Sequence, residues 1–178
     1  MHWISFAIAG GVLHWLYRRG KRAAGTQMAP QHPRATEAAQ APPDPVAAAL
    51  DSEDLDRLQA VVDLAATPLG QHRVLSKIIA LAYRQREDPS LRAVLLENGR
   101  RYIALFPELF PALKAELGEN VHQIPVFKQM AIALGEDGDY GGAVAVCRTA
   151  LDYDMDDGTR TGFEGRIARL QKKAGDTG

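Results

Sequence analysis

The sequence predicts an all-α protein with a hydrophobic helix at its N-terminus, and three observations support this fold class. From residue 51 onward, apolar residues recur at spacings of three and four, the period of a helix that buries one face. The same stretch has no run of alternating β-branched residues and no Asn-Gly or Asp-Gly turn framed by strands. Residues 2–17, HWISFAIAGGVLHWLY, contain no Asp, Glu, Lys or Arg.

We interpret residues 1–22 as a single-pass membrane anchor with a basic flank. Large apolar side chains surround the axis of this helix, so it has no polar face on which to lie at a membrane surface. A secretory signal peptide carries its charge before the apolar run, whereas here the charge follows, at Arg18, Arg19, Lys21 and Arg22. The positive-inside tendency then predicts a cytoplasmic C-terminal domain. Sixteen residues span only about 24 Å at about 1.5 Å per residue, which is shorter than a bilayer core of about 30 Å. An interfacial or partner-buried helix, and a disordered or misassigned start, therefore stay open as alternatives.

The predicted anchor also contains a pair of small residues, Ala7 and Gly11, four positions apart. Pairs of this kind allow membrane helices to approach closely. Self-association through Ala7 and Gly11 is therefore one hypothesis, and incidental small residues in a short apolar run are the other.

Residues 23–50 are predicted to be a linker. They contain many alanines and few large apolar side chains. Five of the ten prolines also lie here: Pro30, Pro33, Pro42, Pro43 and Pro45. Proline lacks a backbone donor and biases the preceding residue to extended backbone, so we expect a spacer.

The domain from residue 51 to 178 begins with four predicted helices. The first is capped by Ser52 and ends before Pro68, and the second runs from about Gln71 to Arg86. A third begins near Ser90 and stops at Phe106-Pro107, because proline disrupts a helix interior. A short fourth, about 108–117, is closed by Gly118.

Residues 124–157 predict a helical hairpin. Its pattern is Phe127-x-x-Met130-Ala131-x-x-Leu134 followed by Tyr140, Ala143, Cys147, Ala150 and Leu151, with a polar turn at 136–139. This pattern resembles the tetratricopeptide repeat, in which small residues such as Ala131 and Ala143 stand where two helices cross. It departs from that family at Cys147, where an aromatic residue is usual, and at Met155, where the closing proline would stand. Four further segments carry a second resemblance: Gln85-Arg86-Glu87-Asp88-Pro89, Ile124-Pro125-x-Phe127, Asp157-Gly158-Thr159 and Gly162-Phe163-Glu164-Gly165-Arg166-Ile167. Through them, most of residues 52–174 is similar to a group of bacterial tetratricopeptide-like proteins, which implies a fold but no activity.

A single repeat needs neighbours to cover its faces, and residues 161–174 are predicted to form a capping helix. Thr161-x-x-Glu164 has the form of a capping box, and Phe163, Ile167 and Leu170 make one apolar stripe. We expect the other face to be solvated; it carries Glu164, Arg166, Arg169, Lys172 and Lys173. The predicted fold is thus a short helical-hairpin solenoid with a C-terminal cap.

The composition offers no sign of a cofactor, a metal or a catalytic site. The formal net charge of −1 does not favour nucleic-acid binding. The acidic run from Asp152 to Gly158 fails the register of a calcium loop, because its glycine is one place late. The single Cys147 lies on an apolar face, which is typical of a buried thiol, and no histidine pair has metal-ligand spacing. We therefore do not expect an enzyme.

The predicted function is a membrane-tethered scaffold that binds a protein or peptide partner at the cytoplasmic face. In the repeat family, the first helix of each hairpin lines the binding groove, which implies Lys128, Gln129, Ile132 and Glu136 as binding residues. Ile132 stands where a clamp for C-terminal carboxylates would use a polar amide, so that kind of tail is not expected. A competing surface for acidic lipid or RNA would use Arg84, Arg86, Arg100 and Arg101. The alternative function is a structural subunit that self-associates or assembles in a membrane complex.

Overall fold

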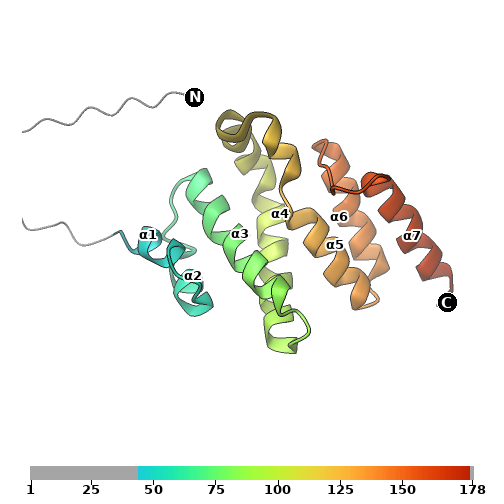
Figure 1. Ribbon diagram of the computed structural model, residues 1–178, viewed down its shortest axis with the longest axis horizontal. Helices are drawn as coiled ribbons and strands as arrows, with labels where there is room; N and C mark the ends of the chain where they lie inside the picture. The colour runs from blue at the N-terminus through green and yellow to red at the C-terminus, as the bar shows by residue number, and fades with distance from the viewer. Residues whose placement is uncertain (1–43, 177–178) are drawn as a thin grey trace, which may run out of the picture. The chain divides into compact units, whose positions relative to one another are not determined.

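The computed structural model describes residues 44–176, and this part of the chain is entirely helical, as predicted (Figure 1). It contains seven α-helices, one 3₁₀ helix and no strand. Their bounds are α1 Pro45–Leu50, α2 Leu55–Val61, α3 Pro68–Arg84, α4 Pro89–Leu117, η1 Gly118–Gln123, α5 Val126–Glu136, α6 Tyr140–Asp152 and α7 Gly162–Asp176.

The predicted anchor, the Ala7–Gly11 pair and residues 23–43 of the predicted linker lie outside the described residues. Within residues 44–176, no helix has both the length and the apolar composition needed to cross a membrane.

The first two helices differ in detail from the predicted ones. Residues 45–50, at the end of the predicted linker, form α1 because Asp44 accepts a hydrogen bond from the Val46 N–H and Pro45 occupies the first turn. Asp54, and not Ser52, caps α2, by accepting hydrogen bonds from the first-turn N–H groups of Asp56 and Arg57. A carboxylate two residues further along therefore displaces the predicted hydroxyl cap.

The predicted break at Phe106-Pro107 is wrong, because α4 continues through Pro107 and Pro111 for 29 residues. Both prolines lie on the exposed side of the helix. Each proline removes one backbone hydrogen bond of the helix, to the carbonyl four residues earlier, while Phe106 and Leu109 stay buried in the core. Burial on one face thus holds the helix together across two prolines. Its end at Leu117, before Gly118 at φ +55°, agrees with the sequence.

The segment predicted to be a hairpin, residues 124–157, contains two helices that pack against each other, α5 and α6. Ala131 on α5 and Ala143 on α6 are buried, and small side chains of this kind allow two helices to pack closely. Gly138 in the turn has φ +79°, which favours glycine, and Asp139 caps α6 by accepting a hydrogen bond from the Gly142 N–H.

The last helix, α7, packs against α6, but its predicted capping box does not form. Thr161 Oγ1 accepts a hydrogen bond from Arg169 Nη1 at 3.1 Å and is not used to cap the helix. A Cβ built on Gly165 would lie only 2.3 Å from Thr161 Oγ1, so a glycine is needed beside this side chain. The Thr161 hydroxyl therefore accepts its hydrogen bond from Arg169, two turns further along α7, and not from the first turn of the helix.

Two successive hairpins, α3–α4 and α5–α6, pack side by side along the domain, and α7 follows the second (Figure 1). An aromatic cluster joins the hairpins. The Phe106 ring on α4 lies 4.8 Å from the ring of Phe127 on α5 and 4.9 Å from that of Tyr153, which follows α6. Tyr102 and Phe110 complete the cluster on α4.

A candidate binding groove between α5 and α7

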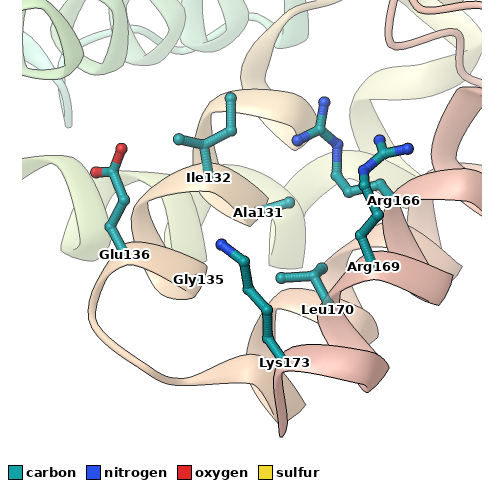
Figure 2. A pocket seen from close by; sticks show the side chains of 8 residues that line it. All are labelled: Ala131, Ile132, Gly135, Glu136, Arg166, Arg169, Leu170 and Lys173. Atoms are coloured by element: carbon teal, nitrogen blue, oxygen red, sulfur yellow. The ribbon is translucent and has the colours of Figure 1, made fainter. Parts of the chain in front are cut away.

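A groove of about 270 Å³ lies between α5 and α7, and we call it the α5–α7 groove. It is lined by four residues from each helix: Ala131, Ile132, Gly135, Glu136, Arg166, Arg169, Leu170 and Lys173. Figure 2 shows the three cations on the α7 side, Ala131 and Ile132 on the α5 side, and Glu136 pointing away from the cations. The two walls therefore differ in chemistry, one apolar and one basic.

Small residues on α5 let the two helices come close enough to share the groove. Ala131 is buried, and a Cβ built on Gly135 would lie 3.0 Å from Leu170 Cδ2. Ile132 is half-buried and extends the apolar surface toward solvent. The result is an apolar floor that can receive a hydrocarbon side chain.

The basic wall follows from helical spacing. Arg166, Arg169 and Lys173 stand three and four residues apart, so they occupy one side of α7. Arg169 is exposed and uses Nη1 for its hydrogen bond to Thr161. Its Nε and Nη2 donors make no hydrogen bond within residues 44–176, so they are open to a ligand.

Arg166 is fixed in place by a buried carboxylate. Its Nε and Nη2 donate to Asp157 Oδ2 at 3.1 and 2.8 Å, and the Asp157 side chain is fully buried. Burial would raise the pKa of Asp157, but hydrogen bonds from Thr159 and from Arg166 outweigh it and lower the pKa below its ordinary value. Asp157 thus stays ionised and holds the guanidinium, whose Nη1 is not used in this pair.

Glu136, at the far end of the groove, belongs to an ion-pair network between the hairpins. It accepts from Arg86 at 2.9 and 3.0 Å and from Arg92 at 2.6 Å, and Arg92 also donates to Asp137 at 2.6 Å. The hydrogen bond from Arg86, together with that from Arg92, lowers the pKa of Glu136 despite partial burial. The network ties the loop between α3 and α4 to the end of α5.

The structure brings only two of the four predicted binding residues into the groove, Ile132 and Glu136. Lys128 turns toward the loop after α6, where its Nζ donates to the Asp157 carbonyl at 2.9 Å. Gln129 is half-buried, and its Oε1 is a buried atom with no hydrogen-bond partner. Glu136 is already paired with two arginines, Arg86 and Arg92. Of the two predicted residues that line the groove, Ile132 is therefore the one that can contact a ligand.

The predicted solvated face of α7 supplies the basic residues that sequence reasoning missed. Only 15% of the Arg166 side chain is exposed, so this face is partly buried. The signal was present as the three-and-four spacing of Arg166, Arg169 and Lys173 beside Leu170. Nothing in that spacing tells which side of α7 faces α5, because this depends on how α7 packs on α6.

The other candidate residues have structural surroundings. Burial raises the pKa of the Cys147 thiol to about 11, and its side chain is fully buried. His72 Nδ1 lies 2.8 Å from the Tyr102 hydroxyl between α3 and α4, and burial lowers the pKa of His72. In the acidic run, Asp157 faces inward to Arg166, and across residues 44–176 no three His, Cys, Asp or Glu side chains gather in a metal-binding arrangement.

The four arginines of the competing basic surface are mostly engaged in ion pairs. Arg84 lies 3.8 Å from Glu53, Arg86 pairs with Glu136, and Arg101 lies 2.5 Å from Asp63. Their charges are therefore balanced locally, which leaves little field for a polyanion.

The chain matches no known protein-family model, and searches of the curated proteins and of the solved structures return no match.

Proposed function

We propose that this protein is a membrane-tethered scaffold with a tetratricopeptide-like helical domain, which binds a segment of a partner protein in the α5–α7 groove. The proposal includes the N-terminal single-pass anchor and a cytoplasmic domain. The order of the helices supports it, because two successive hairpins followed by one further helix are the arrangement that a short repeat array with a cap would have.

The observation that carries the proposal is the lining of the groove. An apolar floor faces a basic wall, and the groove between them has a volume of about 270 Å³. This volume suits one or two side chains of a protein partner better than a drug-sized molecule. The lining has no Ser, Cys or His, and its one carboxylate, Glu136, is held by Arg86 and Arg92. It offers no nucleophile with an adjacent base, so recognition is the chemistry it supports.

Site-specific photocrosslinking of the full chain in the cells that produce it tests this function. A photoreactive amino acid replaces Ile132 in the groove, and the matched control replaces Ala145, an exposed residue on α6. We expect a crosslinked partner protein from position 132 and none from position 145. No adduct at position 132, or the same adducts at both positions, would refute a binding groove.

The alternative, a subunit that assembles with itself, gives a different result in the same experiment. An adduct between two copies of this chain at position 132 would contradict an adaptor function. Repeating the experiment without residues 1–22 tests the role of the anchor, since an adaptor that recognises its partner through the groove should keep the same adduct.

A further inference from the structure

We propose that the α5–α7 groove recognises an acidic segment of extended backbone, in which two carboxylate side chains flank one apolar side chain. This inference rests on the proposed function and names the chemistry of the partner.

The charge around the groove favours an anionic ligand, although the whole chain has a net charge of −1. The lining itself carries three cations, Arg166, Arg169 and Lys173, and one carboxylate, Glu136. Glu136 accepts hydrogen bonds from Arg86 and Arg92, which lie outside the lining. The lining therefore has more positive than negative charge, which attracts carboxylates.

The two arginines on α7 have unused N–H donors, and their side chains lose little conformational entropy when a ligand binds. Asp157 fixes the guanidinium of Arg166 and leaves Nη1 unused, and Thr161 holds Arg169 through Nη1 and leaves Nε and Nη2 unused. Charge-assisted hydrogen bonds from arginine to carboxylate are among the stronger ones in proteins. Fixed side chains lose less entropy on binding, so these two positions are preorganised.

The spacing of the basic wall fits an extended chain. Along α7, the rise is about 4.5 Å from Arg166 to Arg169 and about 6 Å from Arg169 to Lys173, at about 1.5 Å per residue. In extended backbone, side chains i and i+2 point the same way about 6.6 Å apart, and side chain i+1 points the opposite way. Two acidic side chains can therefore face α7 while the residue between them faces Ile132 and Ala131 on α5.

A nucleic acid fits this groove poorly. Single-stranded nucleic acids bind through aromatic side chains on which bases stack, and the lining of the α5–α7 groove contains no aromatic residue. A single C-terminal carboxylate would contact one of the two arginines on α7, whereas two internal acidic side chains can contact both Arg166 and Arg169, so the internal segment is the better fit.

Fluorescence anisotropy with labelled synthetic peptides tests the inference on the full chain in mild detergent. The probe is Gly-Ser-Glu-Leu-Glu-Ser-Gly, acetylated and amidated at its ends. We expect Gln-Leu-Gln and Glu-Ser-Glu versions to bind at least about tenfold more weakly, because each lacks one element of the recognition. A free C-terminus should change binding less than twofold.

Matched protein variants locate the binding. Arg169→Glu should weaken the Glu-Leu-Glu peptide at least about tenfold and favour a Lys-Leu-Lys peptide. Lys172→Glu, the same charge change on an exposed α7 residue outside the groove, should have less than a twofold effect.

Equal binding of the Glu-Leu-Glu and Gln-Leu-Gln peptides would overturn the acidic specificity. A photocrosslink at position 132 would still support the groove in that case, so the two proposals fail separately. Binding of polyuridylate or of anionic phosphatidylserine vesicles that Arg169→Glu abolishes and Lys172→Glu preserves, without peptide binding, would also overturn it in favour of another polyanion.

Discussion

Gly99 on α4 is the position where one added methyl group should most clearly perturb the packing of α4 against α5. A Cβ built there would lie 1.9 Å from Met130 Sδ, 2.7 Å from its Cγ and 2.8 Å from its Cε. Met130 is fully buried, but it also lines a groove of about 310 Å³ beside Leu134 and Val146, so its flexible side chain must shift toward that groove. Overpacking of a core costs about 1–3 kcal/mol, and replacing a helical glycine with alanine returns about 1 kcal/mol. These two terms together leave a loss of about 0–2 kcal/mol, so we expect Gly99→Ala to lower the free energy of unfolding by about 1 kcal/mol.

Equilibrium urea unfolding followed by circular dichroism measures this loss, and a double mutant tests its cause. With Met130→Ala in the background, the clash is gone, and Gly99→Ala should be neutral or stabilise the domain by up to about 1 kcal/mol. Gly141→Ala on exposed backbone of α6 is the control, because its Cβ would meet only Asp139 Oδ1 at 3.9 Å. An equal loss of stability with and without Met130 would refute the steric explanation.

Three further predictions concern the buried and charged groups. Asp157→Asn should lower the free energy of unfolding by about 2 kcal/mol, because it leaves the largely buried Arg166 guanidinium without its counter-charge. Amide hydrogen exchange over residues 153–161 should then accelerate. Unchanged exchange would contradict this role of Asp157. Since the pKa values of Glu136 and Asp157 are lowered in the folded state, their stabilisation is complete above the unfolded values of about 4.5 and 3.8 and is lost as the pH falls further. Acid titration of the unfolding free energy should show this decline, and Glu136→Gln should flatten it. Cys147, with its pKa at about 11, should react with a thiol reagent at pH 8 at least roughly a hundredfold more slowly in the folded chain than in urea; equal rates would show that it is accessible.

The regular parts of the fold could be predicted where one residue type has one dominant effect. The turn at Gly138, the small residues at Ala131 and Ala143, and the end of α4 at Gly118 follow from local sequence, because glycine permits positive φ and alanine permits close helix crossing. Two of the four predicted binding residues, Ile132 and Glu136, reach the groove because α5 was placed correctly.

The errors arose where tertiary contacts outweigh a local preference. Pro107 would end an isolated helix, but Phe106 in the aromatic cluster holds both sides of α4 in the core. Thr161 has the sequence of a capping residue, yet Arg169 takes its hydroxyl. Arg166 was expected to be exposed to solvent. Its partner Asp157 lies nine residues earlier in an acidic run, and nothing in that run indicates that one of its carboxylates is buried.

The aromatic cluster around Phe106 has a consequence for how the domain unfolds. Arrays of helical hairpins hold only nearest-neighbour contacts, so they can lose their terminal units one at a time. Here one ring touches α5 through Phe127 and the chain after α6 through Tyr153, so the second hairpin meets the first at both of its ends. Fraying of α5 or α6 would expose the centre of the first hairpin as well. The two hairpins should therefore form a single cooperative unit, and a partner bound to α5 would stabilise all of it.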